Sequence, residues 1–315
     1  MENNSVPICA KRRPNQSLWL HMKKSYMLYL FLLPSLLFVI LLRYAPIYGI
    51  QIAFKDFNAA KGIWGSPWVG LKHFEMFFTS FRFGLLLKNT LTISLYTLVA
   101  GFPLPIILAL MFNYIRHSGL KKFAQTVSYA PHFISTVILV GMLTMFFSPS
   151  TGFVNTIREG LGLQRLHYFG MPGAFSHLYV WSGIWQNAGW SAVIYIATLS
   201  GIDQSQHEAA IIDGANILQR IRYIDWPALI PTVVILLIME VGSVMGVGYE
   251  KVYLMQNATN LTSSEIISTY TYKIGLEQGA YSYSAAIDLF NNVINFVLLV
   301  SVNKLSKLVS GIGLW

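Results

Sequence analysis

Six long apolar runs limit what this chain can fold into more strongly than any other feature. A helix needs about 20 apolar residues to cross the hydrocarbon core of a bilayer. Only 11% of the 315 residues are charged, whereas a soluble domain carries about 25%. The sequence therefore predicts an all-α membrane protein with six transmembrane helices. We place them at about 26–50, 90–112, 126–147, 178–199, 228–248 and 284–302.

These spans divide the chain into five expected parts. They are a polar N-terminal tail at 1–25, a first transmembrane helix at 26–50, an external segment at 51–84, a five-helix core at 85–303 and a C-terminal tail at 304–315. The core includes a polar loop at 201–227. The first apolar run is too long for the core of a signal peptide, so we interpret it as a span.

Positively charged side chains predict the orientation. Five bases precede the first span, namely Lys11, Arg12, Arg13, Lys23 and Lys24. Lysine and arginine are enriched on the cytoplasmic side of membranes, and the first span usually dominates the topology. With six spans, both termini and the 201–227 loop would then face the cytoplasm. We expect a multi-pass protein of the cell membrane, in contact with lipid.

The remaining composition excludes several classes of function. The net charge is +9, but the bases are dispersed at the edges of apolar segments, which argues against nucleic-acid binding. Cys9 is the single cysteine, so we expect neither an intrachain disulfide nor a cysteine-rich metal cluster. The sequence has no recognisable nucleophile arrangement and no glycine-rich phosphate loop. We therefore expect no enzyme activity and no cofactor in this chain.

The polar loop carries two signals for the start of a helix. Asp203 followed by Gln206 is typical of an N-cap with its partner three residues later, and Asn216 followed by Gln219 repeats the pattern. Each predicted helix is too short to be stable alone in water. The two helices must therefore dock on another surface.

The turn between these helices, and the end of the second, are also marked. Gly214 lies where a helix-ending residue with left-handed backbone is expected. Pro227 should end the second helix, because the residue before a proline avoids helical dihedral angles.

This loop resembles a known one. It contains Glu208-Ala209-Ala210, then Asp213-Gly214-Ala215, then Ile224-Asp225-Trp226-Pro227. The spacing is similar to that of the cytoplasmic loop in permease subunits of binding-protein-dependent ABC importers, with Trp226 where leucine is usual. The resemblance implies the six-helix type I importer permease fold, with coupling helices that sit in a cleft of the ATPase dimer. It assigns the ATPase contact to Glu208, Ala209, Ala210, Asp213, Gly214 and Ala215.

Weaker similarities outside this loop indicate the branch of that family. The segments Pro46 to Lys55, Gly65 to Gly70 and Val247 to Tyr253 resemble permeases for plant-polysaccharide fragments. This resemblance implies an oligosaccharide substrate. It also implies a second homologous permease subunit, an ATPase dimer that binds the ATP and magnesium, and an extracellular solute-binding protein or lipoprotein.

Polar side chains inside the spans are candidates for the substrate path, since such groups are costly in a membrane. Sugars are bound by amide and carboxylate hydrogen bonds, with aromatic rings against their apolar faces. Asp288, Asn292 and Asn295 share one helix face by their spacing. Interhelical hydrogen bonding is an equally good interpretation for any one of these residues. The candidates are Gln186, Asn187, Trp190, Glu240, Asp288, Asn292 and Asn295.

Two other classes of protein account for less of the sequence. An ion-coupled secondary transporter would show inverted repeats and broken helices with buried charges, and would leave the loop motif without a role. An intramembrane enzyme would place paired catalytic groups at one depth, and the sequence shows none. The importer permease explains more of the sequence than either.

Overall fold

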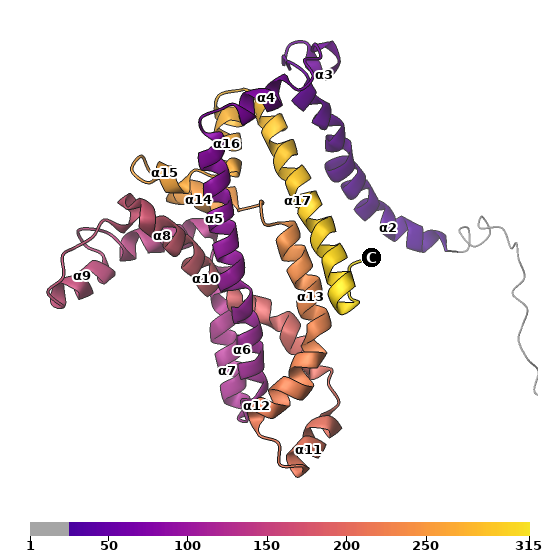
Figure 1. Cartoon of the computed structure of the whole chain (residues 1–315), viewed down its shortest axis with the longest axis vertical. Coiled ribbons are helices and arrows are strands. Elements are labelled where there is room, and N and C mark those ends of the chain that lie inside the picture. Colours follow the sequence, from indigo (N-terminus) through magenta and orange to yellow (C-terminus); the bar gives the residue numbers. More distant parts are fainter. Residues whose placement is uncertain (1–24) are drawn as a thin grey trace, which may run out of the picture. The chain divides into compact units, whose positions relative to one another are not determined.

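The computed structural model describes residues 25–315, which form two compact units, one ending at Gln51 and one spanning Ile52–Trp315 (Figure 1). The predicted N-terminal tail lies outside the described residues, apart from Ser25. Within the described residues the backbone is helical, and the β-structure is limited to one bridge between Lys55 and Trp68. An almost purely helical fold agrees with the all-α prediction.

The first unit contains the helix α2 (Tyr26–Val39) and a π-helical turn (Ile40–Tyr44), from which a 3-10 helix (Ala45–Phe54) leads into the second unit. The 29 helical residues are long and apolar enough to cross a membrane. No residue of α2 is buried. This segment therefore leaves its apolar side chains available to lipid.

The second unit begins with short helices and then a long one. After α3 (Gly62–Gly65) and α4 (Lys72–Phe78), the helices α5 (Phe83–Gly101) and α6 (Pro103–Asn113) form one helical segment of 31 residues. It begins earlier than the predicted boundary at residue 90. Pro103 stands at the start of α6, where its missing N–H is tolerated.

The predicted third span is wrong as one continuous helix. Its region forms α7 (Ser118–Tyr129), a 3-10 turn (Ala130–Phe133) and α8 (Thr136–Phe146), and the chain bends by 98° at the break. The bend follows from local chemistry. Ile134 is extended, and the Ser135 hydroxyl caps the new helix by accepting a hydrogen bond from an N–H of its first turn.

The longest helices of the core pack side by side. After α9 (Phe153–Gly160), α10 (Pro172–Ser200) packs along α6 and α5. Four helical segments in residues 25–315 are long and apolar enough to cross a membrane, and the bent α7–α8 pair would make a fifth. The less apolar α10 is not in that set, so the count of six spans stays a prediction.

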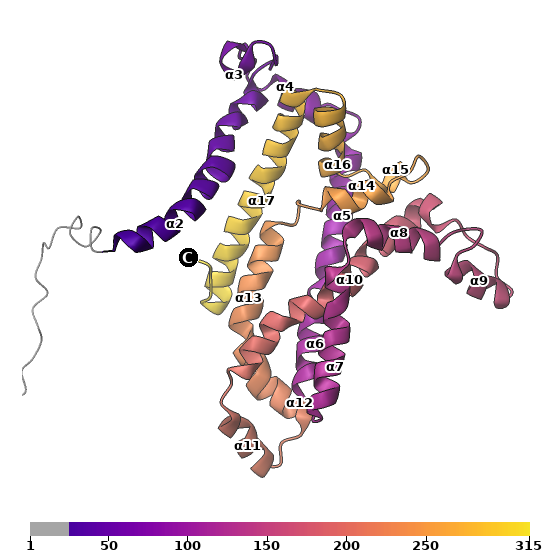
Figure 2. The same cartoon turned by 180° about the vertical axis from the view of Figure 1, so that it is seen from behind.

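The two long helices in the last third of the chain have different bounds from those predicted. The helix α13 (Trp226–Gly242) ends before the expected residue 248 and packs on α17 (Tyr281–Ser310), as both views show (Figures 1 and 2). The helix α17 continues past residue 303, where the predicted five-helix core ends, to Ser310, and it ends at Gly311 with a left-handed backbone.

Three short helices and a π-helical turn connect α13 to α17. They are α14 (Tyr249–Met255), α15 (Leu261–Ser264), α16 (Ile267–Tyr272) and the π-helical turn Lys273–Glu277. Their buried apolar side chains Val252, Met255, Ile267 and Tyr270 belong to two of the hydrophobic clusters of this unit. The buried Glu265 is paired with Arg82 at 2.8 Å and with Lys273 at 3.6 Å, which compensates the cost of burying its charge.

Candidate functional site

The polar loop folds into two helices joined by a glycine turn. They are α11 (Gln204–Ile212) and α12 (Ile217–Arg220), at one end of the second unit (Figures 1 and 2). Gly214 has φ +78°, in the left-handed region that a glycine adopts without strain. Asn216 and Gln219 form a reciprocal capping box. These features confirm the local structure that the sequence predicts.

Two details of the loop differ from the prediction. The Asp203 side chain accepts a 3.0 Å hydrogen bond from the Ser205 N–H, and Gln206 makes no reciprocal contact with the cap. The bond from Ser205 holds the pKa of the Asp203 carboxyl below its usual value. Pro227 does not end the second helix. A π-helical turn (Ile221–Asp225) joins α12 to α13, and Pro227 then lies in the first turn of α13, where no N–H is needed.

The six residues that the loop motif assigns to the ATPase contact lie around this turn. Four of them are exposed, and Ala210 and Ala215 are partly exposed. Large apolar side chains beside them are also exposed, including Ile212 at 85% and Leu218 at 76%. A cluster of exposed apolar side chains is typical of an interaction surface. The motif residues are therefore placed where another protein can reach them.

A buried carboxylate lies directly behind this surface, and the sequence did not single it out as functional. Asp225 is fully buried. Its Oδ2 accepts a 2.6 Å hydrogen bond from the Tyr114 hydroxyl at the C-terminal end of α6, and its Oδ1 lies 3.3 Å from Nε2 of His207 on α11. The three residues are apart in sequence, so the sequence signal for the cluster was limited to an aspartate directly before an apolar run.

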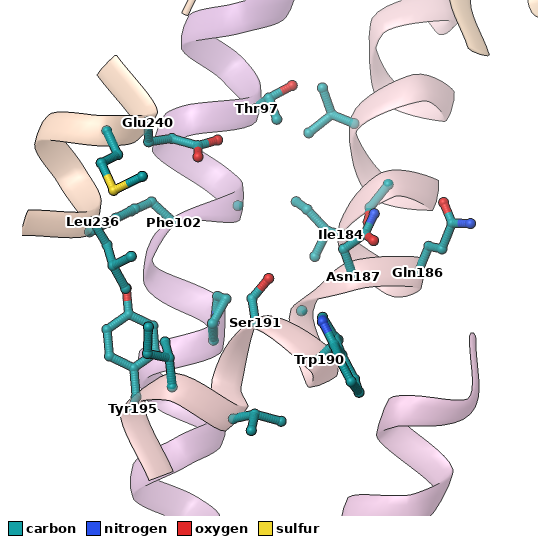
Figure 3. A pocket seen from close by; sticks show the side chains of 18 of the residues that line it. Thr97, Phe102, Ile184, Gln186, Asn187, Trp190, Ser191, Tyr195, Leu236 and Glu240 are labelled. Atoms are coloured by element: carbon teal, nitrogen blue, oxygen red, sulfur yellow. The ribbon is translucent and has the colours of Figure 1, made fainter. Parts of the chain in front are cut away.

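A cavity of about 890 Å³ opens among α5, α6, α10 and α13 (Figure 3). It is lined by four of the predicted substrate-path residues, Gln186, Asn187, Trp190 and Glu240. The structure thus brings side chains of the predicted fourth and fifth spans together. Amide, carboxylate and aromatic groups on an otherwise apolar wall form a typical small-molecule site.

Residues at the bend between α7 and α8 contact the side chains of α10 that line this cavity. Gln186 donates a 2.7 Å hydrogen bond to the backbone oxygen of Ile134, and the Asn187 side-chain oxygen lies 3.0 Å from Nδ1 of His132. The ring of Trp190 stacks on His132 with a 4.9 Å centroid separation. His132 was not predicted, because its neighbours are more than 50 residues away in sequence.

Lys251 is a further lining residue that the sequence analysis did not select. Its ammonium donates a 2.9 Å hydrogen bond to the backbone oxygen of Tyr179 and lies 4.8 Å from the centre of that ring. A Cβ built on Gly183 would come within 3.2 Å of the ammonium, so this glycine leaves room for the charge. Burial lowers the pKa of Lys251 to about 8.

The three candidates on α17 are not part of this cavity. Asp288 lines a separate hollow of about 380 Å³, beside α16. The Asn295 side-chain oxygen accepts a 2.9 Å hydrogen bond from the backbone N–H of Met245, which ties α17 to the end of α13. Asn292 is exposed. The shared helix face of these residues does not place them in one site.

Comparison with known proteins identifies the class of this chain. Residues 101–310 match the family of binding-protein-dependent transport system inner membrane components. The chain belongs to this family, which confirms the resemblance carried by the 208–227 loop. It is a multi-pass membrane permease with the fold of a type I ABC importer permease.

Two relatives from Bacillus subtilis match nearly the whole chain. The polygalacturonan/rhamnogalacturonan transport system permease protein YteP of Bacillus subtilis is 40% identical over 297 residues, covering 94% of this chain and 92% of YteP. Protein LplB of the same organism is 39% identical and covers 91% of this chain and 90% of LplB.

Two solved structures also match nearly the whole chain. A chain of a bacterial ABC transporter that imports the acidic polysaccharide alginate is 37% identical, with a TM-score of 0.86, and the match covers 94% of this chain and all of that one. A second structure, of a bacterial alginate transporter with its pentasaccharide-bound periplasmic protein, is 36% identical with a TM-score of 0.87 and covers 95% of this chain and all of that one.

Proposed function

We propose that this permease forms part of the translocation path of an oligosaccharide importer and receives the ATP-driven motion through residues 208–227. The observation that carries this proposal is the exposed apolar surface beside the motif, with Ile212 at 85% exposure. An ATPase dimer, which binds the ATP and magnesium, is the partner expected to cover that surface. A second homologous permease and an extracellular solute-binding protein would complete the importer. Both termini of this chain would be cytoplasmic.

The cavity between α10 and α13 supports the transport path. Closure of the ATPase dimer would move α11 and α12, rock the spans against each other and expose this cavity to alternate sides of the membrane. The aromatic and amide groups that line it suit a sugar ring. An ion-coupled transporter, the alternative class, gives the exposed loop surface no partner.

The charged lining residues favour an acidic sugar. Among the described lining residues, Lys251 is the sole base and Glu240 the sole acid. Lys251 uses one of its three donors on the Tyr179 carbonyl oxygen. Within residues 25–315 no carboxylate lies within ion-pair distance of its ammonium. A uronate carboxylate of the substrate would supply the missing acceptor, as the relatives named for polygalacturonan and alginate suggest.

Replacing Lys251 by methionine should weaken uptake of an acidic oligosaccharide by about tenfold or more, because a hydrogen bond to a charged group contributes about 1.5–3 kcal/mol. The measurement is uptake of trigalacturonate and of the neutral galactotriose by the complete importer in proteoliposomes. We expect loss for trigalacturonate only. Lys72→Met, on the exposed start of α4, is the control. Equal uptake of trigalacturonate by Lys251→Met and the native protein would refute the acidic-sugar assignment.

The pH dependence of uptake provides a second test of the same contact. A lysine is charged below its pKa, and the pKa of Lys251 is lowered by burial to about 8. Uronate carboxylates stay charged over this range, so trigalacturonate uptake should fall as the pH rises through 8. Lys251→Arg, whose guanidinium stays protonated, should flatten the profile. Glu240 faces the same cavity, and a profile that persists in Lys251→Arg would assign the titration to another group.

A further inference from the structure

The Asp225 cluster joins three elements of the permease. Asp225 ends the π-helical turn that leads into α13, Tyr114 caps the C-terminal end of α6, and His207 lies on α11 immediately before Glu208. The Tyr114 hydroxyl is 2.6 Å from Oδ2 of Asp225, and His207 Nε2 is 3.3 Å from Oδ1. One carboxylate therefore contacts the inner end of a span and the coupling helix at once.

The helix α11 is otherwise barely attached to the spans. Apart from His207 and Ala210, all its residues are exposed. In residues 25–315, the contact of His207 with Asp225 is the one polar side-chain contact from α11 to a predicted transmembrane helix or its ends. A force on α11 can therefore reach the spans through the backbone on either side of α11 and through this pair.

The carboxylate depends on both partners. Asp225 is fully buried, and its Oδ1 makes no hydrogen bond, while His207 Nε2 lies 3.3 Å from it as an ion-pair contact. A buried acceptor that loses its donor keeps its full desolvation cost, so a cluster of this kind favours one arrangement. Burial and the neighbouring Asp225 raise the pKa of Tyr114, so its phenol keeps the proton that it donates. The Arg220 guanidinium covers the Tyr114 ring at 5.2 Å.

We propose that Asp225 is a positioning residue that locks α11 to the inner ends of α6 and α13, so that a movement of the coupling helix is passed to both spans together. The packing of these spans extends the effect. The helix α6 packs along α10, and α13 packs along α17, and both α6 and α13 line the cavity, so two of its walls are reached from Asp225. This inference rests on the proposed coupling through residues 208–227.

The test separates docking of the ATPase from transmission of its motion. His207→Leu removes the link to α11 and leaves the Tyr114–Asp225 bond, whereas His207→Gln keeps a side-chain donor. The double variant Tyr114→Phe/Asp225→Asn removes the charge and the phenol donor together, which avoids leaving a charged buried group unpaired. Each variant is studied in the complete importer in proteoliposomes. The readouts are ATPase subunits copurified with the permease, ATP hydrolysis and oligosaccharide uptake.

We expect His207→Leu and the double variant to bind the ATPase and hydrolyse ATP like the native complex, while uptake per ATP falls by about fivefold or more, the usual lower range of coupling between sites. His207→Gln should recover most of the uptake. Tyr253→Phe is a matched control, because it removes a 2.8 Å phenol–carboxylate bond, to Glu277, away from the loop. The positioning role of Asp225 would be contradicted by unchanged uptake per ATP. It would also be contradicted if uptake, ATP hydrolysis and the amount of permease in the membrane fell in parallel. Failure of the native permease to copurify with an ATPase would instead refute the proposed function.

Discussion

Gly214→Pro should abolish transport while leaving the permease in the membrane. Gly214 has φ +78°, whereas proline fixes φ near −65°. Its N–H also donates a 3.0 Å hydrogen bond to the Ile211 carbonyl, and proline has no N–H. The turn between α11 and α12 would be lost, and with it the surface that we assign to the ATPase. Uptake and ATP hydrolysis by the assembled importer, normalised to permease in the membrane, measure the effect.

A conservative change at the same position is the control for this prediction. Asparagine tolerates the left-handed conformation better than other residues with a side chain, and no atom lies within 4 Å of a Cβ built on Gly214. Gly214→Asn should therefore keep most of the transport. If Gly214→Pro transported like Gly214→Asn, the shape of this turn would have no role in coupling.

Glu208→Ala tests the same surface without disturbing the backbone. The carboxylate is exposed on α11 and would pair with a base on the ATPase. We expect uptake per ATP to fall by about fivefold or more, whereas Gln204→Ala, also exposed and on the same helix, should change little. Equal behaviour of the two variants would count against a specific role for Glu208.

Gly189→Ala should destabilise the permease more than an alanine at either of the other glycines of α10, Gly173 and Gly183. A Cβ built on Gly189 would lie 2.1 Å from the backbone oxygen of Ser128 in α7. The two backbones meet there, as small residues allow in membrane proteins. Overpacking of this kind typically costs about 1–3 kcal/mol. The measurement is the thermal midpoint of the purified protein in detergent, together with its yield from membranes.

Gly173→Ala in the same helix provides the opposite expectation. Nothing lies within 4 Å of a Cβ built on Gly173, and alanine favours a helix over glycine by about 0.5–1 kcal/mol. The midpoint should therefore stay constant or rise. Equal midpoints for Gly189→Ala and Gly173→Ala would mean that α7 and α10 do not meet at Gly189.

The parts of the fold that the sequence predicted well are those set by neighbouring residues. The capping box of Asn216 and Gln219 and the left-handed turn at Gly214 each depend on a few adjacent residues. The helix-breaking role given to Pro227 was wrong, because a π-helical turn before it lets the chain continue into α13. Proline identity alone does not distinguish the end of one helix from the first turn of the next.

The candidate cavity was predicted only in part, for a physical reason. The sequence placed Gln186, Asn187 and Trp190 on one predicted span, and the three line one cavity together with Glu240. Helical spacing grouped Asp288 with Asn295, yet Asp288 faces a different hollow and Asn295 ties α17 to Met245. A shared helix face shows which side chains point the same way, but the neighbouring helix decides what they meet.

By itself, the sequence determined the membrane class, the helical content and the local structure of the 208–227 loop, because apolar run length and capping chemistry act over a few turns of chain. Tertiary structure alone decided where the third predicted span bends, that Gly183 makes room for the Lys251 ammonium, and that Tyr114 and His207 meet on Asp225. Those contacts join residues many turns apart, and helix packing sets which of them come together.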